Sequence, residues 1–337
     1  MSATTLEKVR EKTSVAGRMG RLDLQKFLAF GALIVLFAAF SLASPNFLSW
    51  SNFSGILLAT SVTGVMALGA TFVIATSGID LSVGTAMTLS AVMTAVFLSP
   101  DYLGLPLIVG VVLGVLFGAF TGFINGINIA VLKIPPFIAT LAMMLVAAGL
   151  ALVISGTRPI YFSEVEGFSS ISLGSVIPGV NLPNAVLIFF VAVAIAAVLL
   201  SKSLIGRYAL SIGSNEEATK ISGINTKTWL IRIYTLAGCF TGLAGVLMAS
   251  RLNSAQPALG QGYELEAIAA VVIGGTSLSG GRGSIVGTMI GALLMAVLTN
   301  GLQIISIPQE WQKVAVGIVI LIAVFADNVR RRKEGRA

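Results

Sequence analysis

Three short polar segments interrupt a mostly apolar chain and hold the residues whose types could take part in chemistry. They run from Ser77 to Gly84, from Gly213 to Asn225 and from Gly274 to Ser284. The whole chain has no histidine and a single cysteine, Cys239. Histidine-based acid–base catalysis and zinc-protease motifs are therefore excluded, and so is a disulfide within the chain. We expect no catalytic residue, no metal and no cofactor.

The first segment breaks an apolar stretch around Asp80, the one acidic residue that lies near the membrane interior between two apolar runs. Gly, Asp and Ser at such a break are typical of a helix end followed by a new N-cap. One interpretation is that Asp80 only caps the helix that follows it. The other is that the segment is a polar hinge at the inner side of a pathway, because an ionisable group near the membrane interior usually has a partner or a task.

The second segment predicts a short capped helix. Ser214 or Asn215 could cap it, Glu216 and Glu217 favour its first turn, and Gly223 could end it. Such a helix could be an ordinary surface helix or a rigid contact for a soluble partner. The candidate contact residues are Asn215, Glu216, Glu217, Ala218, Ser222 and Gly223.

The third segment has so many glycines that it predicts a sharply folded connection between two helices. A phosphate-binding loop of the Walker A type needs a Gly-Lys dipeptide, and none occurs in the chain. ATP hydrolysis by that machinery is excluded. Together with the first segment, this connection supplies the candidate pathway or gate residues, which are Ser77, Asp80, Ser82, Thr276 and Ser277.

Long apolar segments must position these polar ones. The chain is 56% hydrophobic and only 10% charged, and a hydrocarbon core of about 30 Å is crossed by about 20 apolar residues in a helix. We predict an all-α fold, a polytopic membrane protein with about ten transmembrane helices, some of them broken or re-entrant. The expected spans are 27–43, 56–76, 81–98, 105–131, 137–154, 185–200, 229–249, 263–273, 285–302 and 314–326.

Glycine recurs at every fourth residue in the fourth expected span. This spacing lines up small residues along one side of a helix, where another helix can approach closely. A glycine ridge that lines a pore is the alternative. The ridge consists of Gly110, Gly114, Gly118, Gly122 and Gly126.

The basic residues predict the orientation of the spans. If residues 1–26 are a cytoplasmic tail, 27–327 a membrane domain and 328–337 a second cytoplasmic tail, then 18 of the 21 Lys and Arg residues lie inside. Only Arg158, Arg251 and Lys313 lie outside, as the positive-inside rule favours. Glu264 and Glu266 are then expected at the outer start of the eighth span. The net charge of +7 is explained by this pattern, so no nucleic-acid partner is expected.

The same polar segments carry a resemblance to a known family. The chain resembles, from about residue 27 to its end, the membrane permeases of bacterial ABC importers for ribose and related sugars. The motifs are TSGIDLSVG at 76–84, IPPFIATLAMMLVAAGLALVISGTRPI at 134–160, GSNEEATKISGIN at 213–225, RLNSAQPALGQGYELEAIAAVVIGGTSLSGGRGSIVGT at 251–288 and VILIAVFADN at 319–328.

The resemblance implies a role and a set of partners. It implies a permease dimer in the lipid of the bacterial inner membrane, a cytoplasmic ABC ATPase beneath it and an extracytoplasmic sugar-binding protein above it. Residues 213–225 would contact the ATPase, and the outer loops around 156–183 and 251–262 would receive the binding protein. The sugar would be a ribose-like pentose or a related monosaccharide, whose identity the resemblance leaves open.

Two other classes of function remain as alternatives. An ion-coupled secondary sugar carrier usually buries several ionisable groups along its path, and this chain offers one candidate, Asp80. A membrane-embedded enzyme or a purely structural protein is the other alternative. An enzyme would need a reactive constellation, and the chain has neither histidine nor clustered carboxylates.

Overall fold

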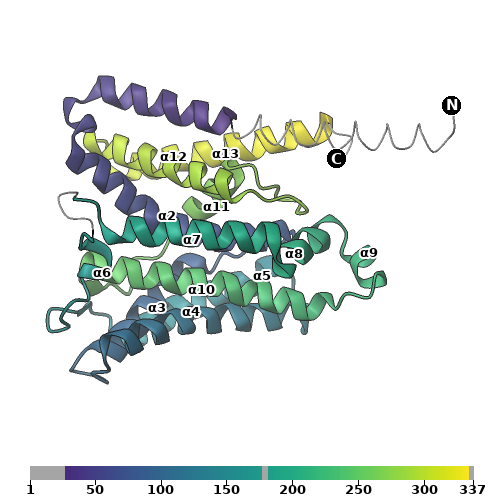
Figure 1. Ribbon diagram of the computed structural model, residues 1–337, viewed down its shortest axis with the longest axis horizontal. Helices are drawn as coiled ribbons and strands as arrows, with labels where there is room; N and C mark the ends of the chain where they lie inside the picture. The colour runs from purple at the N-terminus through teal and green to yellow at the C-terminus, as the bar shows by residue number, and fades with distance from the viewer. Residues whose placement is uncertain (1–26, 177–180, 334–337) are drawn as a thin grey trace.

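The computed structural model describes residues 27–176 and 181–333, which form a bundle of roughly side-by-side helices (Figure 1). The predicted N-terminal tail, residues 1–26, and the end of the predicted C-terminal tail lie outside the described residues. The first helix is Phe27–Ala43. The elements after it are η1 (Pro45–Leu48), α2 (Trp50–Ala75), α3 (Val83–Leu98), α4 (Leu107–Ala130), α5 (Pro136–Ser155), β1 (Ile160–Tyr161), α6 (Ser170–Leu173), α7 (Asn184–Lys202), α8 (Leu204–Ser214), α9 (Glu216–Ile221), α10 (Thr226–Leu252), β2 (Ser254–Ala255), α11 (Tyr263–Ile273), α12 (Ile285–Ile304) and α13 (Gln309–Lys333).

The predicted apolar spans coincide with helices. Six of the described helices, α2, α4, α5, α7, α10 and α12, are long and apolar enough to cross a membrane, and Phe27–Ala43 and α3 are shorter apolar helices. The ends differ from the predicted ones by up to seven residues, most at α13, which ends at Lys333 rather than residue 326. The helical fold class is therefore confirmed in its coarse form.

Side chains just before several helices explain where those helices begin. The hydroxyl of Ser49 accepts a hydrogen bond from the Asn52 N–H at the start of α2, at 3.2 Å. Ser284 accepts one from the Gly287 N–H at the start of α12, at 3.1 Å. These bonds satisfy backbone donors that a helix leaves unpaired in its first turn.

Two very short strands depart from the all-α prediction. β1 and β2 pair in antiparallel fashion, with Tyr161 opposite Ser254. The pair fastens the loop that follows α5 to the end of α10, at the end of the bundle where α6 lies (Figure 1). No periodicity could predict strands of two residues each.

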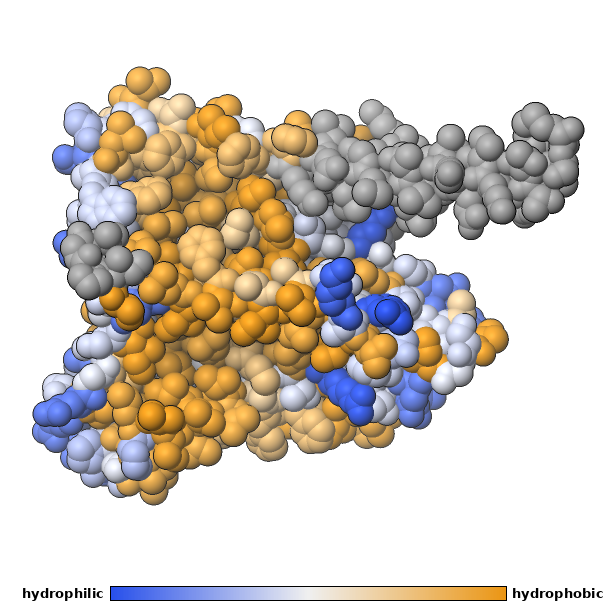
Figure 2. All heavy atoms as spheres, viewed as in Figure 1, coloured by the Kyte–Doolittle hydropathy of each residue, from blue (hydrophilic) through white to orange (hydrophobic). Residues whose placement is uncertain are grey.

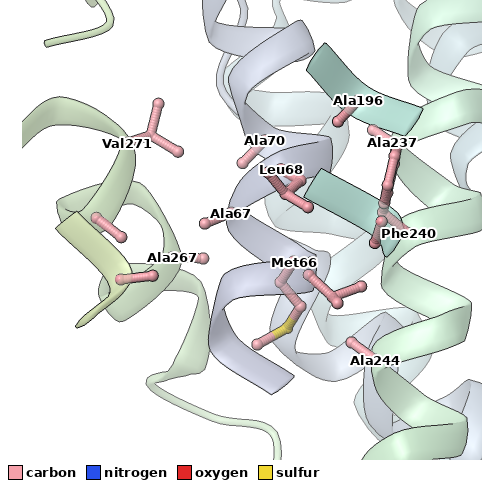
Figure 3. Close-up of a cluster of buried hydrophobic side chains, with 14 of the residues drawn as sticks. Met66, Ala67, Leu68, Ala70, Ala196, Ala237, Phe240, Ala244, Ala267 and Val271 are labelled. Atoms are coloured by element: carbon pink, nitrogen blue, oxygen red, sulfur yellow. The ribbon is translucent and has the colours of Figure 1, made fainter. Parts of the chain in front are cut away.

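The centre of the bundle is α2. Figure 3 shows its side chains between those of α11 on one side and those of α7 and α10 on the other. Met66 and Leu68 of α2 have no exposed surface, and they share one apolar cluster with Phe240 of α10 and Val271 of α11. Ten of the 22 buried residues that other parts of the chain contribute to this cluster are alanines, so the helices can approach closely.

The glycine ridge of α4 lies against two other helices. A Cβ at Gly110 or Gly114 would meet Leu98 or Thr94 of α3, whereas a Cβ at Gly118 would overlap the backbone of Gly242 in α10. Gly122 and Gly126 also lie against the backbone of α10. The ridge therefore occupies a helix–helix contact in this chain.

The outer surface of the bundle is apolar across its middle. Figure 2 shows apolar residues over the centre of the visible face and polar residues toward its two ends. Large side chains such as Ile108, Val153 and Leu321 are more than 70% exposed. An apolar belt between two polar rims is the surface that a bilayer requires.

Two helices, α3 and α11, begin inside the bundle rather than at its rim. Gly260, just before α11, lies so close to Gly84 in the first turn of α3 that a Cβ there would overlap the Gly84 carbonyl. From Gly84, α3 runs to Leu98, about 21 Å at 1.5 Å per residue. Residues 256–262 therefore descend along α3 into the membrane region. Glu264, which was expected at the outer start of the eighth span, is 8% exposed and lies against Gly84 inside the bundle.

We predict that replacing Gly118 by Leu destabilises the bundle. Its side chain would force apart the backbones of α4 and α10, and overpacking a close contact costs about 1–3 kcal/mol or more. The matched control is Gly149→Leu in α5, where no atom lies within 4 Å of an added Cβ. Thermal unfolding in detergent should begin at a lower temperature for Gly118→Leu only. Equal stability of both variants would contradict the close contact.

Candidate functional site

The break after α2 is a tight turn that ends in a buried carboxylate. Asp80 is 6% exposed and Ser82 is 2% exposed. One carboxylate oxygen of Asp80 accepts hydrogen bonds from the Ser82 N–H at 2.8 Å and the Ser82 hydroxyl at 2.6 Å. The capping interpretation needs correction, because Ser82 is the N-cap of α3 and no side chain caps that helix by a hydrogen bond. Asp80 instead shapes the turn that leads into it.

Asn125 of α4 completes this buried polar group, and the sequence analysis did not single it out. Its side-chain amide donates to the Ser82 hydroxyl at 2.9 Å, and Asn125 is 1% exposed. The bond ties the break to α4, one residue before the last glycine of the ridge. An amide in a span of apolar residues was the available signal, but the span also contains Asn128, and the sequence could not show which of the two meets a helix break.

The second polar segment forms the predicted short helix, α9. Its N-cap is Asn215, whose side-chain oxygen accepts from the Ala218 N–H at 2.9 Å. Glu216 forms an ion pair with Lys220 at 2.6 Å. The helix ends at Ile221, and Gly223 follows with a φ of +83°, a conformation that glycine adopts without strain.

The helices α8 and α9 form the projection at one end of the bundle (Figure 1). Glu216, Glu217 and Ala218 are exposed there. A shallow groove of about 400 Å³ lies between the two helices. It is lined by Leu210, Ser211, Ser214, Asn215, Ala218, Thr219, Ser222 and Ile224. A short capped helix with a small residue beside a groove is suited to contact with another protein.

The third polar segment is folded back on itself. Thr276 and Ser277 are 1% and 4% exposed, so they face the protein in this structure. The hydroxyl of Thr276 accepts from the Ser284 N–H at 3.3 Å, and the hydroxyls of Ser277 and Ser279 are 2.9 Å apart. The segment therefore has a defined shape in spite of its glycines.

Residues from all three segments meet at one point, which we call the inner junction and define as Ser77, Gly213, Ser279, Gly280 and Gly281. The Ser77 hydroxyl lies 2.7 Å from the Ser279 carbonyl oxygen and 3.2 Å from that of Gly213. The Gly281 N–H donates to the carbonyl of Ala75, the last residue of α2, at 2.9 Å. The junction therefore joins the break after α2, the end of α8 and the loop between α11 and α12.

The glycines of the inner junction are required by its close contacts. A Cβ at Gly213 would overlap the carbonyl oxygen of Ala75, and one at Gly281 would meet the Ser214 side chain. Ser77 itself has a φ of +66°, which is uncommon for a residue with a side chain. The surrounding bonds hold this conformation. The end of α8 and the end of α2 are therefore held in direct contact.

We predict that Gly213→Ala disrupts the inner junction. The added methyl group would overlap the backbone of α2, so the contact must open. Gly283→Ala is the matched control, because its Cβ would meet only side-chain atoms at 3.6 Å or more. Hydrogen exchange of residues 75–82 and 274–284 should rise in Gly213→Ala and not in Gly283→Ala. Unchanged protection in Gly213→Ala would mean that the two segments are not held together there.

Comparison with known proteins places these features in a family. Residues 52–324 match the family described as branched-chain amino acid transport system / permease component. The chain is 44% identical over 306 residues to the ribose import permease protein of Bacillus subtilis (strain 168), covering 90% of this chain and 93% of that protein. It is 41% identical over 300 residues to the ribose import permease protein of Escherichia coli (strain K12), covering 89% and 92%.

A third relative carries a different sugar in its name. The galactose/methyl galactoside import permease protein of Escherichia coli (strain K12) is 37% identical over 332 residues, covering 93% of this chain and 98% of that protein. No solved structure matches the chain. The family match covers most of the helical bundle, including all three polar segments and the inner junction. The chain belongs to the family of permease components of the branched-chain amino acid transport type.

Proposed function

We propose that this chain is the membrane permease subunit of an ATP-driven importer and forms the translocation path for a monosaccharide. The family and the names of its relatives, which are ribose and galactose import permeases, support this class. The observation that carries the proposal is the inner junction. It connects an exposed helix suited to a protein contact with the breaks between membrane helices, in a chain without a Walker A loop of its own.

The division of labour implies three protein partners. ATP is hydrolysed by a cytoplasmic ABC ATPase, which binds α9 through Asn215, Glu216, Glu217, Ala218, Ser222 and Gly223. An extracytoplasmic binding protein delivers the sugar to the opposite end, near the paired strands β1 and β2. Only the first residues of the loop 251–262 are available to the binding protein. The later residues of this loop run along α3 toward Gly84. A second copy of this chain completes the path.

We propose ten membrane-crossing segments with both ends of the chain in the cytoplasm of a bacterial cell. Eight are the apolar helices already described and the ninth is α13. The tenth is residues 256–273, in which a non-helical stretch along α3 and the short helix α11 cross together. The start of helix Phe27–Ala43 and the end of α13 lie at the end of the bundle that carries α8 and α9 (Figure 1). The excess of basic residues favours this end as the inner one.

We predict the orientation from this arrangement. A reporter fused after residue 170 should read as external, and one fused after residue 215 as cytoplasmic, because α7 and α8 carry the chain from one end of the bundle to the other. Paired alkaline phosphatase and fluorescent protein fusions make this measurement. The opposite result at either position would overturn the orientation.

The sugar is proposed only as a class. Galactose has one hydroxymethyl group more than ribose and a different arrangement of hydroxyl groups, and both sugars appear in the names of relatives. In a system with a binding protein, most selection occurs before the sugar reaches the permease. We therefore propose a neutral monosaccharide, with a ribose-like pentose as the first candidate to test.

We predict that Ala218→Arg weakens docking of the ATPase. The long charged side chain would project from α9 beside the groove, whereas Ala218→Ser keeps a small residue and is the control. Co-purification with the cognate ATPase should fall at least tenfold in Ala218→Arg, a loss of about 1.4 kcal/mol or more. Insertion into the membrane should be the same in both variants. Full docking of Ala218→Arg would place the contact elsewhere, with residues 274–284 as the next candidate.

The proposed function itself is tested by uptake into vesicles. Permease, ATPase and binding protein are reconstituted together, and radiolabelled ribose and galactose are offered with and without ATP. Uptake that requires ATP and both partners supports the importer. Uptake by the permease alone, driven by an ion gradient, would instead support the secondary carrier.

A further inference from the structure

The start of α11 places polar side chains well inside the membrane region, away from both ends of the bundle. Gly260 touches Gly84, about 21 Å from the outer end of α3 in a hydrocarbon core of about 30 Å. From Tyr263, α11 runs only 11 residues, about 16 Å, before the loop that leads to the inner junction. It is therefore a half-length helix whose N-terminus lies inside the membrane region.

One carboxylate at this N-terminus, that of Glu264, has a structural role. Glu264 is 8% exposed, and its two carboxylate oxygens lie 3.0 and 3.1 Å from the Gly262 N–H. It also packs against Gly84, where a Cβ would overlap it. A negative charge in the first turn of a helix is favourable, so Glu264 stabilises the start of α11.

The neighbouring polar residues are not buried in the same way. Gln261 is exposed on the surface of the chain, and Tyr263 and Glu266 are half-buried. Among the described residues, neither Gln261 nor Glu266 has a side-chain hydrogen bond or ion pair within the chain. An acidic side chain at the bilayer centre is too costly to face lipid, so it faces a water-filled cavity or another subunit.

We propose that Gln261, Tyr263 and Glu266 line the translocation path and hydrogen-bond the hydroxyl groups of the passing sugar. The inference rests on the proposed function and adds the residues that contact the substrate. A carboxylate and an amide offer the acceptors and donors that sugar hydroxyls need, and a tyrosine ring adds an apolar face. None of the three was among the pathway candidates chosen from the sequence, four of which are buried in this structure.

The first test measures access to water. Cys239, the only cysteine, is replaced by Ser, and a single cysteine is introduced as Gln261→Cys or Glu266→Cys in the assembled importer. A charged methanethiosulfonate reagent reacts with thiolates in water and not with thiols in lipid. The control is Leu116→Cys on α4, an apolar residue 53% exposed at similar depth, two residues from the contact between Gly118 and Gly242.

We expect the cysteines in α11 and the segment before it to react at least tenfold faster than the control, in the resting or the ATP-bound state. Ribose and its binding protein should slow the reaction during turnover. Labelling of Gln261→Cys and Glu266→Cys as slow as that of Leu116→Cys in both states would overturn the proposal.

The second test measures the concentration dependence of uptake. Glu266→Gln should raise the binding-protein and ribose concentration for half-maximal uptake about tenfold, as expected for the loss of one charge-assisted hydrogen bond. Co-purification with the ATPase and thermal stability should stay as in the wild type. Unchanged half-maximal concentrations in Glu266→Gln, with wild-type uptake intact, would contradict the proposal.

The two tests also separate this inference from the proposed function. Failure of the wild type to take up sugar with ATP would count against the importer, whereas the labelling test still decides whether residues 261–266 line a water-filled path. Uptake by the wild type without labelling would count against the path alone.

Discussion

The structure depends on one constraint, which is that a polar backbone group in hydrocarbon must find its partner within the protein. The chain breaks its helices after α2, before α11 and between α11 and α12. Backbone N–H groups at these breaks donate hydrogen bonds to carbonyl groups of the same chain. The Gly78 N–H donates to the Val73 carbonyl at 3.2 Å, and the Gly281 N–H donates to the Ala75 carbonyl at 2.9 Å. The second bond requires the backbones of separate segments in contact, and Gly213, Gly280 and Gly281 allow that approach.

The same close approach distinguishes two parts of the bundle. In one, α10 packs against α4 and against α2 through glycine and alanine, as at the contacts of Gly118 with Gly242 and of Gly69 with Ala237. The other is the end that carries α8 and α9, where three separate connections meet at Ser77. The Gly213 contact places the end of α8 directly against the end of α2. The short helix α11 lies between this end and the contact of Gly260 with Gly84.

The sequence predicted the elements better than their meeting points. Hydropathy located the spans, and Asn215 with Glu216 and Glu217 located α9, because both signals are local along the chain. The inner junction joins Ser77 to residues more than 130 positions away, and no periodicity carries that information. The depth of α11 was missed for a related reason. Its apolar residues are compatible with a short span that starts at either face of the bundle. Only the contact of Gly260 with Gly84 shows where α11 begins.

The central claim is that ATPase binding at α9 is transmitted through the inner junction to the membrane helices. A cryo-EM structure of the permease with its ATPase in lipid nanodiscs, determined with and without ATP, tests it most directly. The account predicts that α9 lies in contact with the ATPase and that Gly213 and the end of α2 move together between the two states. An ATPase bound elsewhere, or an α8–α9 unit that moves while Ser77 and Ala75 stay in place, would contradict it.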